Sequence, residues 1–106
     1  MRISKEGNLV TLINVFETTP ERQQALIDQW VRFTEKARNE PGYIGTALHK
    51  SKDGTRVVNY AHWRSPAHFE AFVNKYRADF AQFGQNASRI DPHTYDVVYL
   101  DEPTAT

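Results

Sequence analysis

The chain has 106 residues, a length that suits one domain with a modest hydrophobic core and is short for two. Lysine plus arginine and aspartate plus glutamate number 13 each, so no net positive charge attracts nucleic acid or an anionic membrane. Cysteine is absent, which excludes disulfides and cysteine-based metal sites, and no stretch reaches the roughly 18 apolar residues of a membrane helix. We therefore expect a cytoplasmic protein with one domain over residues 8–100, between flexible tails at 1–7 and 101–106.

A strand and a helix are the first two predicted elements. Residues 8–16 (NLVTLINVF) are rich in β-branched and apolar side chains and too few for a typical helix, which indicates a buried strand. Thr18 and Glu21 have the spacing of a capping box, and Pro20 suits a first helical turn. Apolar or weakly polar positions then recur every three or four residues until a Pro-Gly pair at 41–42 ends the pattern. These signals predict one amphipathic helix.

A hairpin is expected next. Residues 43–50 and 56–63 are two strand-like runs, and Asp53-Gly54 between them is a strong turn signal. Ser65-Pro66 then has the form of a helix start, and the residues after it supply a second apolar helical stripe. The sequence thus predicts two paired strands followed by a second helix.

The end of the domain is predicted to hold a short helix and a last strand. Residues 79–88 keep a helical spacing of phenylalanines that Gly84 weakens, which favours a short extra helix. Residues 93–100 (HTYDVVYL) are typical of a strand, and Asp91-Pro92 before them favours a break.

The order strand, helix, strand, strand, helix, strand is that of ferredoxin-like α+β folds, βαββαβ, with a four-stranded antiparallel sheet. The first and third strands should be central, and both helices should cover one face of the sheet. The third strand nevertheless carries large apolar groups on both faces, with Val57 and Trp63 on one and Val58 and Tyr60 on the other. An uncovered apolar face of this kind predicts a homodimer joined sheet to sheet.

The third predicted strand also places an amide on an apolar face. Alternation along the strand puts Asn59, Ala61 and Trp63 on one side. A buried amide without hydrogen-bond partners costs roughly 1 to 3 kcal/mol, so a ligand pocket at this face is one explanation. The alternative is that Asn59 bonds to neighbouring backbone and that Trp63 is an ordinary core residue.

The segment from His49 to Trp63 (HKSKDGTRVVNYAHW) resembles the antibiotic-biosynthesis monooxygenases, and the similarity covers most of the chain. The resemblance implies a dimeric α+β barrel. It is closest to small cofactor-independent enzymes that oxidise anthrone-type aromatic polyketides to quinones. In those enzymes the matching residues imply catalytic roles for Asn59 and Trp63 and, through a weaker match, for His49. Phe69 stands where related enzymes have a tyrosine, so that hydroxyl is missing here.

The implied reaction needs neither metal nor flavin, because an electron-rich phenol or anthrone can lose a proton and pass an electron to molecular oxygen, the co-substrate. Asn59 and Trp63 are then expected to donate hydrogen bonds to the developing phenolate or peroxide oxygen. His49 or a neighbouring histidine is expected to move the proton. No pair among the four histidines has the i, i+4 spacing of a metal motif, and no bound metal is expected.

Aromatic residues crowd the predicted helices, which is first of all a sign of core packing. Those that face Trp63 are also candidates for a flat cleft that stacks on a polycyclic substrate. The residues expected to bind substrate are Asn14, Phe69, Phe72 and Tyr76.

Two other functions remain open at this point. The first is a haem-degrading monooxygenase on the same fold, because Asn14 and Trp63 resemble two of that group's three signature residues. The third, a haem-ligating histidine near Val73 and Asn74, is missing, and His68 lies about a turn too early. The second is a non-catalytic dimeric α+β barrel that binds a small molecule or acts as a stress protein.

Overall fold

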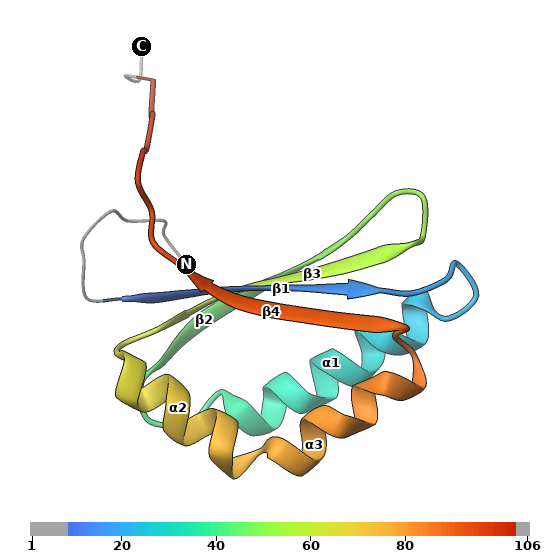
Figure 1. Cartoon of the computed structure of the whole chain (residues 1–106), viewed down its shortest axis with the longest axis horizontal. Helices are drawn as coiled ribbons and strands as arrows, with labels where there is room; N and C mark the ends of the chain where they lie inside the picture. Colours follow the sequence, from blue (N-terminus) through green and yellow to red (C-terminus); the bar gives the residue numbers. More distant parts are fainter. Residues whose placement is uncertain (1–8, 104–106) are drawn as a thin grey trace.

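The computed structural model describes residues 9–103, so the predicted N-terminal tail and the last residues of the C-terminal tail lie outside the described residues. Four strands form one antiparallel sheet in the order β2-β3-β1-β4. All helices lie beneath one face of this sheet (Figure 1), which confirms the ferredoxin-like α+β fold with the first and third strands central. The elements are β1 (Val10–Glu17), α1 (Gln23–Ala37), β2 (Tyr43–Lys50), β3 (Arg56–Trp63), α2 (Pro66–Lys75), α3 (Arg77–Ala81), the 3-10 helix η1 (Gln82–Gln85) and β4 (Arg89–Tyr95).

The β2–β3 hairpin has the bounds that the sequence predicted. In its turn, Asp53 Oδ1 accepts hydrogen bonds from the Thr55 hydroxyl at 2.7 Å, the Thr55 N–H at 2.9 Å and the Ser51 hydroxyl at 2.8 Å. These bonds, led by the one from the Thr55 hydroxyl, lower the pKa of Asp53 to about 2. Gly54 follows with a φ of +81°, a conformation that side chains with a Cβ rarely adopt. Local chemistry therefore fixes this turn.

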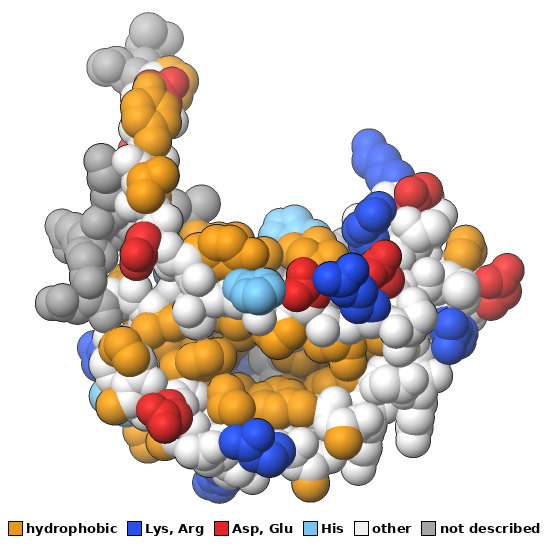
Figure 2. Space-filling view, viewed as in Figure 1, with side chains coloured by type: hydrophobic (Ala, Val, Ile, Leu, Met, Phe, Trp, Pro, Cys, Tyr) orange, Lys and Arg blue, Asp and Glu red, His pale blue; other side chains and the backbone are white. Residues whose placement is uncertain are grey.

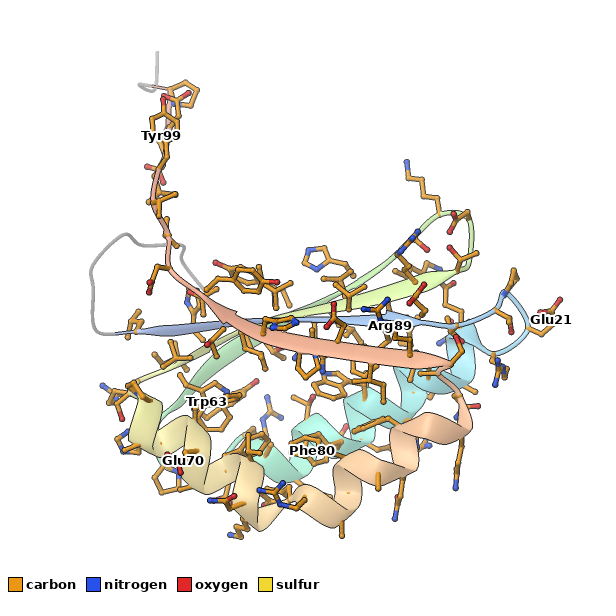
Figure 3. The ribbon with its side chains drawn as sticks, in the orientation of Figure 1. Glu21, Trp63, Glu70, Phe80, Arg89 and Tyr99 are labelled. Atoms are coloured by element: carbon orange, nitrogen blue, oxygen red, sulfur yellow. The ribbon has the colours of Figure 1, made fainter. Side chains whose placement is uncertain are left out.

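The start of α1 differs from the prediction. The helix begins at Gln23, and its N-cap residue Arg22 makes no side-chain capping bond. The Thr18 hydroxyl instead donates to the carbonyl of Asn86 at 2.6 Å, so the predicted capping box is wrong. Glu21, the other half of that box, points away from the molecule (Figure 3). A tertiary contact explains the difference, because the Thr18 side chain links the connection after β1 to the connection before β4.

The last strand was predicted at the wrong position. β4 begins at Arg89, continues through Asp91-Pro92 where a break was expected, and ends at Tyr95. Proline has no N–H and is excluded from the inside of a sheet, but β4 is an edge strand that pairs with β1. Beyond Tyr95 the chain leaves the sheet and extends away from it (Figure 1).

The second helical region agrees with the prediction. Ser65 caps α2, because its hydroxyl accepts a hydrogen bond from the His68 N–H at 3.2 Å, and Pro66 is the first helical residue. The short helices α3 and η1 follow at 77–85, where one extra helix was expected. No helix in the described part of the chain is both long and apolar enough to cross a membrane.

The hydrophobic core lies between the sheet and the helices. Aromatic rings dominate it, with many centroids within about 6 Å of a neighbouring ring in tilted or edge-on geometry. The large buried side chains of this core are Phe16, Leu26, Trp30, Phe33, Trp63, Phe72 and Phe83. Packing of these bulky, flat groups leaves an internal space against the sheet.

Candidate active site

A cavity of about 490 Å³ lies between the sheet and the helices. This volume is in the range of small-molecule sites. A hollow bordered by hydrophobic side chains is visible below β4 (Figure 2). The wall is mostly apolar, and its polar exceptions include Asn14, Thr34, Tyr43, Thr46, Asn59 and Thr94.

The cavity stays open because the helices cover the sheet unevenly. Helix α1 packs against β2 and β3, and α2 packs against β3. The inner side of the edge strand β4 is left to form a wall of the cavity through Ile90, Pro92 and Thr94. Ile90 remains 37% exposed although it faces the helices. The edge strand β4 thus lies beside the opening of the cavity to solvent.

Two asparagines form the polar centre of the cavity wall. Asn14 of β1 and Asn59 of β3 lie directly opposite each other in the sheet, and both are buried. The Thr46 hydroxyl of β2 donates to Asn59 Oδ1, which holds the amide in one orientation and leaves its nitrogen as a donor. Within residues 9–103 that nitrogen has no hydrogen-bond partner, and Asn14 Oδ1 is buried without one. Unused hydrogen-bonding groups in an apolar cavity favour a polar ligand group at this point.

Trp63 is a core residue and a cavity wall at the same time. It is only 2% exposed, and its ring centroid lies 4.5 Å from that of Phe72 and 6.1 Å from that of Phe69. Trp63 and Phe80 both lie in the space between sheet and helices, whereas Glu70 lies on the outside of α2 (Figure 3). The structure therefore brings together five of the residues predicted from the sequence: Asn14, Asn59, Trp63, Phe69 and Phe72.

Tyr76 is not among the residues that line the cavity. Its hydroxyl donates to Glu40 Oε1 at 2.7 Å, and the same oxygen accepts from Lys75 Nζ at 2.7 Å. These contacts raise the pKa of Tyr76 and lower the pKa of Glu40. Tyr76 therefore joins α2 to the loop that precedes β2, and it reaches the cavity wall only through its packing on Phe72 and Phe33, with ring centroids 5.1 Å and 5.5 Å away.

His49 lies outside the cavity. It pairs with Val58 in the sheet and so points to the opposite face from Asn59, where it is exposed. His62 is on that same face, and burial lowers the pKa of its imidazole. His93 borders the cavity, but its ring pairs with Asp91 at 2.7 Å.

His68 also lies outside the cavity, because its Nδ1 is 2.7 Å from the Ser65 hydroxyl in the first turn of α2. At the position where the haem-degrading alternative needs a histidine, the cavity is lined by Val73. Among residues 9–103, no group of three or more His, Cys, Asp or Glu side chains could hold a metal ion.

Sequence reasoning missed the polar wall residues Thr34, Tyr43, Thr46 and Thr94, of which Tyr43 and Thr46 lie in β2. Thr46 lies opposite Ala61, so extending the hairpin register from the Asp-Gly turn could have placed it on the cavity face. Tyr43 lies opposite Trp63 only because of an irregularity in β2, for which the sequence carries no evident signal.

Residues 9–84 match the protein family described as Antibiotic biosynthesis monooxygenase. This segment contains β1, the β2–β3 hairpin and α2, which together supply both asparagines and Trp63. The chain belongs to the antibiotic biosynthesis monooxygenase family. The family predicted from the His49–Trp63 segment is therefore confirmed.

The antibiotic biosynthesis monooxygenase assignment agrees with individual relatives. Over 70 residues the chain is 49% identical to the tetracenomycin-F1 monooxygenase of Streptomyces glaucescens, a match that covers 65% of this chain and 62% of that protein. The chain thus spans less than two thirds of this relative. A putative monooxygenase from Shewanella loihica PV-4 is 30% identical with a TM-score of 0.74, covering 88% of this chain and 97% of its own. An anthrone oxidase-like protein has a TM-score of 0.83 at 25% identity, covering 92% of this chain and 42% of its own.

Proposed function

We propose that this chain is a monooxygenase that oxidises a phenolic or anthrone-type aromatic to a quinone with molecular oxygen and without metal or organic cofactor. The observation that carries the proposal is the pair of buried asparagines, with unused hydrogen-bonding groups, on the wall of an aromatic cavity. The names of a 49% identical relative, a tetracenomycin-F1 monooxygenase, and of an anthrone oxidase-like structural neighbour support the same substrate class.

The proposed reaction balances without another reductant. An anthrone loses a proton from its central CH2 group, and the resulting anion transfers one electron to O2. The two radicals combine to form a peroxide anion at that carbon, which is protonated from water to a hydroperoxide and so recovers the proton released in the first step. Loss of the second hydrogen with cleavage of the O–O bond gives the carbonyl of the quinone and one molecule of water. One oxygen atom of O2 thus enters the product and the other leaves as water.

Within this scheme the residues stabilise and orient rather than exchange protons. The described cavity wall contains no carboxylate, so negative charge that develops on the substrate meets hydrogen-bond donors instead of a repelling anion. The Asn59 amide, held by Thr46, donates to the anionic oxygen. Asn14 Oδ1 accepts from a substrate hydroxyl. The proton leaves to water at the opening beside β4.

Dithranol, a hydroxylated anthrone, provides the test. We expect chelator-treated protein to consume one O2 for each quinone formed, at a rate well above the protein-free blank. With 18O2, one labelled oxygen atom should appear in the quinone. A rate equal to the blank, or a rate that requires added metal or flavin, contradicts the proposal. Binding of dithranol without turnover indicates the non-catalytic alternative, and a Soret shift on haem titration indicates the haem-degrading one.

We also propose that the functional unit is a homodimer joined through the open sheet face. This face presents Ile13, Val15, Val58 and Tyr60, and no helix of the described chain covers it (Figure 1). An apolar face of this kind is stabilised by burial against a second copy.

Sedimentation equilibrium is expected to give twice the chain mass. Val58→Asp should give a folded monomer, because it places a charge in the centre of the proposed interface. The matched control is Val31→Asp, on the exposed side of α1 where Val31 is 47% accessible, and it should remain dimeric. Wild-type protein that sediments at the mass of one chain contradicts this assembly.

A further inference from the structure

Strand β2 contains a bulge at Ile44. Tyr43 pairs with Trp63 and Gly45 pairs with His62, so Ile44 is an extra residue between two consecutive partners on β3. In a regular strand, the pairing of Gly45 with His62 would place Ile44 opposite Trp63 and turn Tyr43 to the other face of the sheet. The bulge reverses this arrangement: Ile44 is 39% exposed, and Tyr43 lines the cavity. Bulges near functional sites commonly redirect a side chain in this way.

Contacts on both sides hold Tyr43 in place. Its N–H donates to the Glu40 carbonyl at 3.2 Å, and the carbonyl of Gly42 accepts from the Arg64 N–H at 2.8 Å. The Tyr43 ring packs edge-on against Trp63, with centroids 5.5 Å apart and planes at 80°. A side chain fixed in this manner can present its hydroxyl in one position without a large loss of conformational entropy on binding.

The hydroxyl of Tyr43 is a neutral donor. Burial raises its pKa, against a smaller opposing effect of the Arg38 charge, so it stays protonated at neutral pH. It has no hydrogen-bond partner within residues 9–103, and Tyr43 is the only tyrosine among the described residues of the cavity wall. Its cross-strand partner Trp63 is four residues from Asn59 along β3, which corresponds to about 13 Å. Tyr43 therefore adds a hydroxyl group at the Trp63 end of the cavity wall, separate from the asparagine pair.

We propose that Tyr43 determines specificity by donating a hydrogen bond to an acceptor oxygen on the terminal ring of a polycyclic aromatic substrate, the ring farthest from the asparagine pair. The inference rests on the proposed function only in taking an aromatic as the ligand. The acceptor can be a carbonyl, carboxylate or phenolate oxygen, because each accepts a hydrogen bond from a neutral hydroxyl. The substrate class narrows to elongated fused-ring aromatics with oxygen substituents at both ends.

Two ligands that share a skeleton test this role: anthraquinone-2-carboxylate and 2-methylanthraquinone. Binding is followed by quenching of tryptophan fluorescence, because Trp30 and Trp63 both line the cavity. Tyr43→Phe should weaken binding of the carboxylate about three- to tenfold, the effect of one hydrogen bond, and leave binding of the methyl compound unchanged. The control Tyr99→Phe removes a hydroxyl from the exposed segment after β4, where Tyr99 is 76% accessible (Figure 3), and should change neither constant.

The outcomes separate this inference from the proposed function, since binding needs no turnover. Equal loss of affinity for both ligands in Tyr43→Phe shows a packing role and overturns the inference, as does no loss for either ligand. In both cases the aromatic site itself stands. If wild-type protein binds neither anthraquinone, the aromatic site and the role of Tyr43 fall together.

Discussion

Asn59→Ala is expected to lower kcat for dithranol oxidation about 100- to 1,000-fold, the usual effect of removing one preorganised donor from a developing anion. The amide is buried, its orientation is set by the Thr46 hydroxyl, and its nitrogen faces an apolar cavity in which water cannot replace it cheaply. Initial rates of O2 uptake at saturating dithranol measure the effect, and circular dichroism checks that the variant is folded.

Two further variants serve as comparisons for Asn59→Ala. Thr46→Val removes the hydroxyl that orients the amide but keeps the amide, so its loss in kcat should be smaller than that of Asn59→Ala. Asn74→Ala changes an asparagine on the exposed side of α2, where its Oδ1 accepts from Arg77, and kcat should stay at the wild-type level. Wild-type kcat in Asn59→Ala, or an equal loss in Asn74→Ala, contradicts the assignment of the site.

Gly42→Ala is expected to destabilise the fold by about 2 to 5 kcal/mol, through left-handed backbone strain and overpacking together. Gly42 has a φ of +84°, and a Cβ at this position would lie 2.4 Å from both Cβ and Cγ of His68. The conflict involves the first turn of α2, so relief requires movement of the helix and not only of a side-chain end. Unfolding by urea, followed by fluorescence, measures the change in the free energy of unfolding.

Gly84→Ala is the matched control for this substitution. Gly84 lies in η1, and a Cβ there meets no atom within 4 Å. The free energy of unfolding of the Gly84→Ala variant should differ from that of the wild type by no more than about 0.5 kcal/mol. Similar losses in the two variants argue against a specific steric requirement at Gly42. A stable Gly42→Ala protein shows that α2 can shift without cost.

Short-range signals allowed much of the fold to be predicted. The Asp53-Gly54 turn and the Ser65-Pro66 cap act within a few residues, and both occur where expected. Strand periodicity placed Asn59 and Trp63 on one face, because alternation along β3 is regular. Predictions from short-range signals were wrong where a distant contact uses the same side chain. The Thr18 hydroxyl bonds to the carbonyl of Asn86, 68 residues away, and does not cap α1.

The cavity wall was predictable only in part, because it depends on how the strands are aligned. Regular alternation within β2 would place Tyr43 on the same face of the sheet as His49. The extra residue Ile44 moves Tyr43 to the cavity face and leaves His49 on the opposite face. Pro92 was interpreted as a break for a similar reason, since its tolerance depends on β4 having a free side. Neither property is visible in one strand considered alone.

The free side of β4 also affects how the protein behaves in concentrated solution. An exposed strand edge can template a strand from another molecule, and growth by that route produces ribbons and fibrils. Pro92 withholds one amide hydrogen from such a template, and the same strand carries the charged residues Arg89 (Figure 3) and Asp91. Growth of ribbons and fibrils along this edge is therefore disfavoured.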